Sequence, residues 1–299
     1  MNNENVSKQW NKINKELFDE NLVVNMDSFK DSNYFYKLAM WKPETNGVRY
    51  YKSFLYFVCS TLDEGHWEIL NKVRNREIGG SNHMIEYNNL KICLDYVQAA
   101  LEYSFISSKF DFCSKRILEI GAGYGRTAHT IIQNSDITSY TIVDLPECLH
   151  LSQTYLKSVL NATEFTKLSF LSASEFKKSE MSFDLVINID SMAEMDKSIV
   201  EEYLIKIGKN SLYFYAKNPV GKYQDPSLLN KNVDKEAIAF ALKTGPLNQI
   251  VDIFSAEDIG KQEQLFLNAY KPKGDWEAII SAWASPWSYY WNVLYQKVN

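Results

Sequence analysis

Three glycines at alternate positions form the first pattern that could carry chemistry: Gly121, Gly123 and Gly125, in the stretch ILEIGAGYGR. An apolar run precedes them and a helix-like run follows, as in a turn whose bare backbone approaches a ligand. A dinucleotide-binding turn carries glycine at its sixth position, where this chain has Arg126, and no Gly-Lys-Ser/Thr of a phosphate loop follows. The spacing therefore predicts a binding turn of another kind.

Two carboxylates accompany this turn. Glu119 stands two residues before Gly121, and Asp144 ends the next apolar run. Glu119 can act on an ammonium group, directly or through water, and Asp144 can accept hydrogen bonds from both hydroxyls of a ribose. Together they predict a ligand with an amino-acid end and a nucleoside end. The alternative is that these are ordinary turn glycines and that Asp144 caps a helix beginning at residue 146.

The elements that must position these residues alternate between apolar strands and helix-like runs from residue 115 onward, which implies parallel strands joined by crossovers. Expected strands cover residues 116–120, 139–145, 167–171, 183–189 and 210–217, with two more in NQIVDIF (248–254) and QLFLNAY (264–270), one of them antiparallel. Expected helices include 127–133 and 146–160, the latter with proline at its start. The pattern predicts an α/β fold whose doubly wound sheet has about seven mostly parallel strands.

Residues 1–110 have a different pattern and are expected to be mostly helical, with one amphipathic helix over residues 89–106. The segment RNREIGGSNHMIEY (74–87) breaks this region at Gly79 and Gly80. We therefore divide the chain into a helical N-terminal region, residues 1–110, and an α/β domain, residues 111–299. The first is expected to cover an acceptor or to form an oligomer contact.

Composition excludes several classes of function. The formal net charge is −5 and no basic stripe offsets it, which argues against nucleic acid as a partner. No run is long and apolar enough to span a membrane, and the polar N-terminus does not resemble a signal peptide. The four cysteines are far apart and no metal-ligand spacing is visible, so we expect reduced cysteines, no metal and a cytoplasmic location.

Two stretches, LEIGAGYGR and TIVDLPECLHLSQTYL, resemble the class I S-adenosylmethionine-dependent methyltransferases. With VINIDSMAEMD (186–196), the order of motifs is similar to that of bacterial sugar O-methyltransferases, over about residues 74 to 220. The resemblance implies a Rossmann-like class I methyltransferase sheet in the domain 111–299 and S-adenosylmethionine as the methyl donor. It also implies a sugar hydroxyl, or another small-molecule oxygen or nitrogen, as the acceptor, while a catalytically silent donor-binding protein is a further alternative.

The resemblance also implies which residues contact the donor. Its amino-acid end is expected at Glu119 and the glycine turn, its ribose at Asp144, and its adenine near residues 172–174, where serine stands at position 174 although class members often carry an acid. The full set of expected donor contacts is Glu119, Gly121, Ala122, Gly123, Gly125, Asp144, Leu145, Ser172, Ala173, Ser174 and Asn188.

Methyl transfer to a hydroxyl needs a residue that removes one proton. In open parallel sheets ligands lie at the carboxyl ends of the strands, so Asp190 and Glu194, which follow the strand at 183–189, are candidates. The alternative for Glu194 is a solvated acid in the first turn of a helix. His83, in the break at 74–87, is a third candidate, because a neutral imidazole accepts protons near pH 7.

The stretch WASPWSYYWNVLY (283–295) is rich in aromatic residues. Core packing against the sheet is one interpretation, because such rings bury large apolar areas. A wall of the acceptor site or the contact of a homodimer are the others.

Overall fold

The computed structural model describes residues 7–9, 11–12, 43–80, 83–223 and 235–298. The chain divides into two compact units, Met1–Phe57 and Val58–Asn299. Their boundary falls inside helix α3 (Pro43–Thr61). The sheet and the cavity described below belong to the second unit. The functional division near residue 110 stays a prediction.

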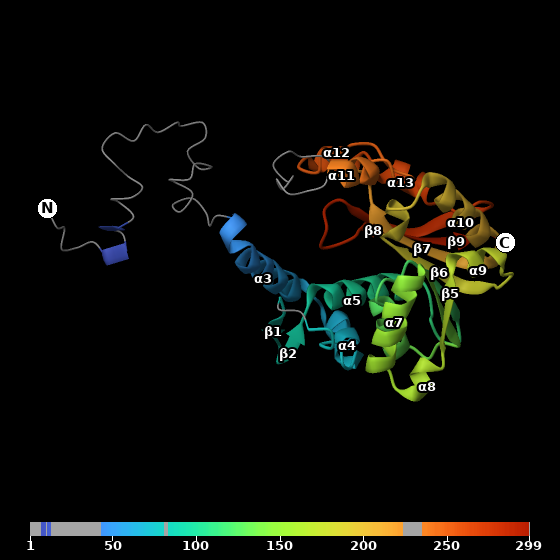
Figure 1. The fold of residues 1–299 in the computed structure, drawn as a ribbon, viewed down its shortest axis with the longest axis horizontal. Helices are drawn as coiled ribbons and strands as arrows, with labels where there is room; N and C mark the ends of the chain where they lie inside the picture. The colour runs from blue at the N-terminus through green and yellow to red at the C-terminus, as the bar shows by residue number, and fades with distance from the viewer. Residues whose placement is uncertain (1–6, 10, 13–42, 81–82, 224–234, 299) are drawn as a thin grey trace. The chain divides into compact units, whose positions relative to one another are not determined.

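A seven-stranded sheet forms the centre of the second unit, in the order β5-β4-β3-β6-β7-β9-β8 (Figure 1). Its strands are β3 (Arg116–Ile120), β4 (Ser139–Asp144), β5 (Leu168–Ser172), β6 (Phe183–Ile189), β7 (Ser211–Pro219), β8 (Trp276–Trp283) and β9 (Tyr290–Lys297). The first five pair in parallel, whereas β9 is antiparallel to both of its neighbours. The predicted fold class, an α/β sheet of about seven mostly parallel strands, is confirmed.

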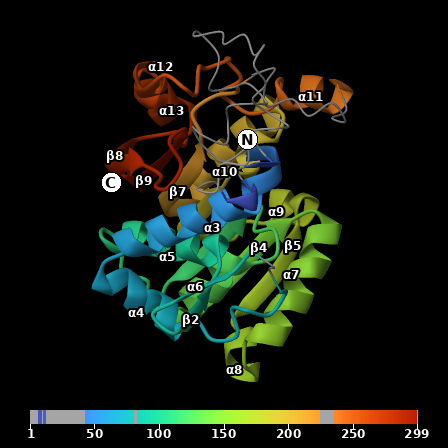
Figure 2. The same cartoon turned by 90° about the vertical axis from the view of Figure 1, so that its left-hand side faces the viewer.

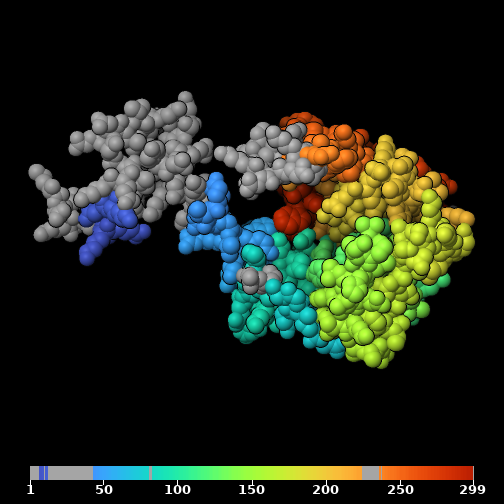
Figure 3. All heavy atoms as spheres, viewed as in Figure 1, coloured from blue at the N-terminus to red at the C-terminus, as the bar shows by residue number. Residues whose placement is uncertain are grey.

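Helices cover both faces of the sheet, and consecutive strand residues serve the two faces in turn. On one face, α5 (Leu94–Ser107), α6 (Arg126–Asn134) and α7 (Pro146–Val159) pack on residues such as Ile117 and Leu185. On the other, α9 (Ala173–Lys178), α10 (Lys197–Asn210) and α13 (Glu263–Ala269) pack on Leu118 and Val186. In the turned view, α5, α6 and α7 lie in the lower half of the picture and α13 in the upper half (Figure 2), and the space-filling view likewise shows the green part of the chain below the orange part (Figure 3).

The two last predicted strands were wrong in position. Residues 248–254 form no strand, and only a single bridge joins Ile250 to Lys222. Residues 264–270 lie largely in α13, because Phe266 and Tyr270, four residues apart, are both fully buried, as on one face of a helix. The strands that complete the sheet are β8 and β9, which include the aromatic stretch.

The helix expected over 89–106 begins later. Residues Leu90–Ile92 form β2, which pairs with β1 (Ile85–Tyr87) as an antiparallel hairpin. Asn88 and Asn89 make the two-residue turn with φ of 50° and 61°, which asparagine tolerates and which favours a tight hairpin. The described remainder of the region contains α3, α4 (Glu64–Lys72) and α5, so it is mostly helical as predicted. Short helices α8 (Ala162–Phe165), α11 (Lys235–Ala241) and α12 (Ala256–Gly260) and the 3₁₀ turn η2 (Ser191–Ala193) complete the described elements.

All four cysteines are free thiols. Within the described ranges, no helix is both long and apolar enough to cross a membrane. In the same part of the chain, no group of three or more His, Cys, Asp or Glu side chains is arranged to hold a metal ion.

Candidate functional site

A cavity of about 380 Å³ opens at the carboxyl ends of β3 and β6. The chain runs from β3 outward to β5 and then returns to β6, on the other side of β3. The strand order therefore reverses between β3 and β6. In sheets of this kind, ligands usually bind at such a reversal. Its lining consists of Gln98, Glu119, Gly121, Ala122, Gly123, Tyr124, Arg126, Thr127, Ile189, Asp190, Lys217, Trp287, Tyr289 and Tyr290. We call residues 119–127 the glycine wall, and Trp287, Tyr289 and Tyr290 the aromatic wall.

The three glycines of the glycine wall have different surroundings, so glycine is required at each position for a different reason. All three have positive φ, between 58° and 96°. A Cβ on Gly121 would lie 2.1 Å from Ser191 Oγ, and one on Gly125 would lie 2.8 Å from Leu156 Cδ1, so these two permit close packing. A Cβ on Gly123 would meet nothing within 4 Å. Gly123 is therefore the position where bare backbone faces open space.

Side chains behind the glycine wall fix its path. Asp144 Oδ2, at the end of β4, accepts a hydrogen bond of 3.0 Å from Gly123 N–H. Asn188 Nδ2, at the end of β6, donates to Ile120 O at 3.0 Å and to Ser191 Oγ at 2.7 Å. The carboxyl ends of three parallel strands thus hold one turn in place.

Glu119 is a buried carboxyl at the base of the cavity, with 2% of its surface exposed. Burial raises its pKa to about 7, although the Tyr140 hydroxyl donates a 2.7 Å hydrogen bond to Oε2, which favours the charged form. A cation entering the cavity would stabilise the ionised carboxylate. Glu119 is thus suited to meet an ammonium group.

Two cations also line the cavity, and they share one carboxylate. Lys217 Nζ and Arg126 Nη2 lie 2.7 Å and 3.0 Å from Glu102 Oε1. Burial opposes ionisation of Glu102, but the two cations outweigh it and lower the pKa of its carboxyl. Because Arg126 and Lys217 both line the cavity while Glu102 lies behind them, the floor here favours an anionic group.

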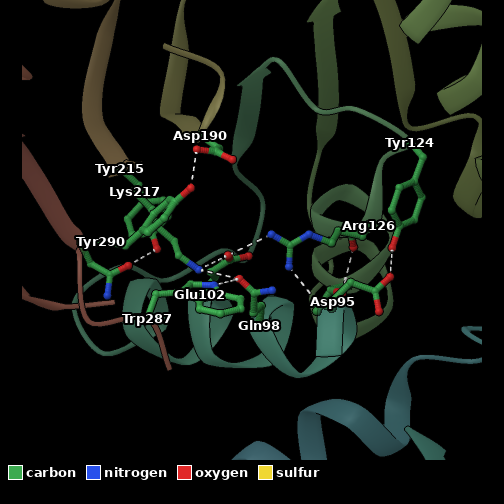
Figure 4. Close-up of polar contacts among 12 residues, drawn as sticks. Asp95, Gln98, Glu102, Tyr124, Arg126, Asp190, Tyr215, Lys217, Trp287 and Tyr290 are labelled. Carbon is green, nitrogen blue, oxygen red and sulfur yellow. Dashed lines mark hydrogen bonds and ion pairs between the residues drawn. The ribbon is translucent and has the colours of Figure 1, made fainter. Parts of the chain in front are cut away.

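One face of α5 carries the polar groups that hold these cations (Figure 4). Gln98 Oε1 accepts hydrogen bonds from Lys217 Nζ at 3.3 Å and from Trp287 Nε1 at 2.8 Å. Arg126 Nη1 donates to Asp95 O at 2.6 Å. Asp95, Gln98 and Glu102 have helical spacing, so they share the side of α5 that meets the cavity. Gln98 thereby joins the cationic floor to the aromatic wall.

Asp190 follows β6 with φ of 67°, a conformation that residues with a side chain rarely adopt. Its N–H donates to Lys217 O at 2.8 Å, and its Oδ1 accepts a 2.8 Å hydrogen bond from the Tyr290 hydroxyl. Strained residues of this kind are common at functional sites. Asp190 is the carboxylate between the glycine wall and the aromatic wall.

The structure brings five of the sequence-predicted residues into the cavity lining: Glu119, Gly121, Ala122, Gly123 and Asp190. Gly125, Asp144 and Asn188 do not line this cavity: Gly125 packs against Leu156, and Asp144 and Asn188 form hydrogen bonds to the backbone of residues 120–123. Leu145 follows Asp144 and is exposed.

The remaining predicted residues lie elsewhere. Ala173 and Ser174 line a second cavity of about 200 Å³ with Phe176 and Tyr203. Ser172 caps α9 by accepting the N–H of Glu175.

Glu194 and His83 are both exposed and do not line the first cavity. Glu194 ends η2 and acts electrostatically on Lys222, while His83 lies in a turn before β1. The catalytic roles proposed for them stay predictions.

Sequence reasoning missed Gln98, Glu102 and Lys217, and it used Arg126 only to exclude a dinucleotide. A signal existed for two of them: Glu102 is an acid within the apolar stripe of an amphipathic segment, and Lys217 is a charge at the end of an apolar strand. The aromatic stretch was noted, but three interpretations stayed open for it. Trp287, Tyr289 and Tyr290 lie in the cavity wall, and Trp291 and Tyr295 are buried in the core.

No protein-family model matches the chain, and no curated protein matches it either. Among solved structures, the pyocyanin biosynthetic protein PhzM aligns with a TM-score of 0.47 at 11% identity, over 91% of this chain and 76% of PhzM. The mitomycin 7-O-methyltransferase MmcR aligns with a TM-score of 0.45 at 11% identity, over 68% of this chain and 55% of MmcR. PigF with SAH aligns with a TM-score of 0.42 at 15% identity, over 65% of this chain and 60% of PigF. This chain spans little more than half the length of MmcR, and likenesses of this size carry no argument about activity.

Proposed function

We propose that the protein is an S-adenosylmethionine-dependent methyltransferase. The observation that carries the proposal is the mixed charge of the cavity beside the open glycine turn, whose lining includes the carboxyl of Glu119 and the cations Arg126 and Lys217. The amino-acid end of the donor is a zwitterion, which needs one group of each sign. The resemblance of the motifs points to the same cofactor.

The residues present fit this donor. Glu119 would hold its ammonium, and Arg126 with Lys217 its carboxylate. The backbone at Gly123 leaves room for the ligand, and Asp144 retains lone pairs for ribose hydroxyls after accepting the Gly123 N–H. Residues 172–174 stay the predicted adenine contact. When bound, the donor would supply an electrophilic methyl group on a sulfonium.

The acceptor is proposed to present a hydroxyl to Asp190. This carboxylate lines the cavity and is exposed, so it can take the hydroxyl proton and pass it to water. Trp287, Tyr289 and Tyr290 offer flat apolar faces beside it, which suit the face of a sugar ring. We therefore propose a saccharide as the acceptor, in keeping with the resemblance to sugar O-methyltransferases.

Two measurements test these steps separately. Calorimetry with S-adenosylmethionine is expected to show one donor site, and Lys217→Met is expected to weaken it, while Lys209→Met, an exposed lysine of α10, leaves it unchanged. Incubation with methyl-labelled donor and a panel of free sugars, methyl glycosides and nucleotide sugars is expected to label a sugar product. Absence of donor binding would overturn the proposal. Donor binding without transfer to any acceptor, including small amines and phenols, would favour a catalytically silent binding protein.

A further inference from the structure

The carboxyl of Asp190 is held from two directions. Its main chain is fixed in the left-handed region by the hydrogen bond to Lys217 O, and its Oδ1 is fixed by the Tyr290 hydroxyl. Among the described residues, no hydrogen bond reaches Oδ2. One carboxylate oxygen is therefore committed to Tyr290 and the other is left for the cavity.

Tyr290 reaches Asp190 from a distant part of the chain. It is the first residue of β9 and pairs with Pro219 of β7, so antiparallel pairing sets the height of its ring above the sheet. The Tyr289 ring lies 5.1 Å from it at 54°, and the Tyr223 ring lies 5.6 Å from Tyr289. These contacts restrict the movement of the Tyr290 phenol away from Asp190.

Other titratable groups also act on Asp190, and they come from several elements. Lys217 of β7 and Lys222, which follows it, attract the carboxylate, whereas Tyr270, Tyr289 and Tyr290 are neutral at working pH because burial, the largest cause in each case, raises the pKa of their phenols. A neutral phenol can donate a hydrogen bond throughout the physiological pH range. The Tyr290 donor is therefore a constant feature of the site.

We propose that Tyr290 is a positioning residue for methyl transfer, which holds Asp190 so that its Oδ2 accepts the proton of the acceptor hydroxyl. This inference rests on the proposed function. As the hydroxyl oxygen forms its bond to the methyl carbon, the carbon–sulfur bond breaks with its electron pair remaining on sulfur, and the hydroxyl proton moves to Asp190. Tyr290 keeps its own proton and only orients the carboxylate.

The test compares Tyr290→Phe with Tyr295→Phe, a matched control on the same strand. Tyr295 donates a 2.7 Å hydrogen bond to Leu267 O and does not line the cavity, so its variant reports the loss of a phenol on β9 without any contact to Asp190. With labelled donor and a sugar from the panel above, Tyr290→Phe is expected to lower kcat about tenfold or more, with donor affinity and acceptor KM within about twofold.

Asp190→Asn separates positioning from a general effect on the fold. If Tyr290 acts through Asp190, the double variant Asp190→Asn/Tyr290→Phe is expected to be no slower than Asp190→Asn alone. Additive losses, or a Tyr290→Phe variant that behaves like Tyr295→Phe, would overturn the proposal.

A readout that needs no acceptor is the carboxyl band of Asp190 in infrared difference spectra between the wild type and Asp190→Asn. In Tyr290→Phe this band is expected to shift in frequency, because Oδ1 has lost its hydrogen-bond donor. If the wild type transfers no methyl group but the band shifts as expected, the proposed function fails while the contact stands. If the wild type is active and the band does not shift, the positioning role alone fails.

Discussion

The two walls of the cavity are built by different means. At its glycine turn, residues 121–125, the first wall presents backbone, with positive φ at three glycines, and Asp144 and Asn188 tie this turn to neighbouring strands. The aromatic wall is side chain, and it comes from the β8–β9 segment, which joins the sheet through antiparallel pairing of β9 with β7. A backbone turn selects a ligand by shape, because a side chain added at Gly123 would occupy the space of the ligand, whereas a side-chain wall can change its chemistry without changing the fold. We therefore expect the first to bind the donor and the second to select the acceptor.

The largest effect is expected from filling the one open position of the glycine wall. Gly123→Val is expected to weaken S-adenosylmethionine binding by at least about 1,000-fold, ~4 kcal/mol, because its side chain would occupy the space of the ligand. Calorimetry measures the affinity. Gly80→Val is a control matched for backbone strain, since Gly80 has φ of 60° and also meets nothing within 4 Å. Equal donor affinity in the two variants would mean that the turn does not face the donor.

A smaller effect is expected from the buried acid of the same wall. Because burial raises the pKa of Glu119 from 4.5 to about 7, the native protein keeps this proton over a range in which the unfolded chain has lost it. The resulting stabilisation is complete below about pH 4.5 and is lost as the pH rises toward 7, by about 3 kcal/mol. Urea unfolding at several pH values is expected to show this decline in the wild type and not in Glu119→Gln. Glu201→Gln, on the exposed side of α10, serves as the control and is expected to follow the wild type; parallel curves for all three proteins would contradict the assignment.

Removing the tie behind the glycine wall is expected to cost less. Asp144→Ala is expected to weaken donor binding by about 2 kcal/mol, roughly 30-fold, through loss of the ribose acceptor and of the Gly123 contact. Asp184 offers a matched carboxylate, because its Oδ2 likewise accepts a backbone N–H, that of Arg116, at the opposite ends of the strands. Asp184→Ala is expected to leave donor affinity unchanged in calorimetry. A loss as large as that of Asp144→Ala would point to a general effect on the sheet.

The smallest effect is expected at the aromatic wall. Trp287→Phe removes the N–H that binds Gln98 and keeps an aromatic face, so the acceptor KM is expected to rise about fivefold, ~1 kcal/mol, with donor affinity unchanged. Steady-state kinetics with labelled donor measures the acceptor KM, and calorimetry measures the donor affinity. If the variant weakens donor binding more than acceptor binding, the division of labour between the two walls is wrong.

The glycine wall could be predicted from the sequence because its information is local. Strand, turn and helix follow one another within residues 116–134, and each glycine of the turn takes a φ that other residues avoid. The place of Asp144 at the end of the next strand followed from the same local pattern, and its contact with a ribose stays a prediction. The parallel direction of the first five strands followed from their alternation with helices.

The rest of the site could not be predicted because its contacts join distant segments. Lys217 Nζ meets Glu102 across 115 residues, and Trp287 meets Gln98 across 189. The sequence around Lys217 or Trp287 does not indicate which distant residue each of them contacts. The error at 264–270 had another cause: a short apolar run fits both a strand and a helix, and only the packing of Phe266 and Tyr270 against the core decides between them.

Helix α5 carries Asp95, Gln98 and Glu102 on the side that meets the cavity, in a layer where most neighbours are apolar. Apolar contacts alone would let a helix slide or turn with little penalty, because one buried methyl group can replace another. Here, rotation of α5 by one residue, about 100°, would leave two buried cations and the carboxylate between them without partners. The polar residues of α5 therefore fix the helix in one orientation against the sheet. Inserting one alanine between Asp95 and Gln98 would rotate Gln98 and Glu102 away from the cations by about 100°. The helix would then pack wrongly although its composition had hardly changed.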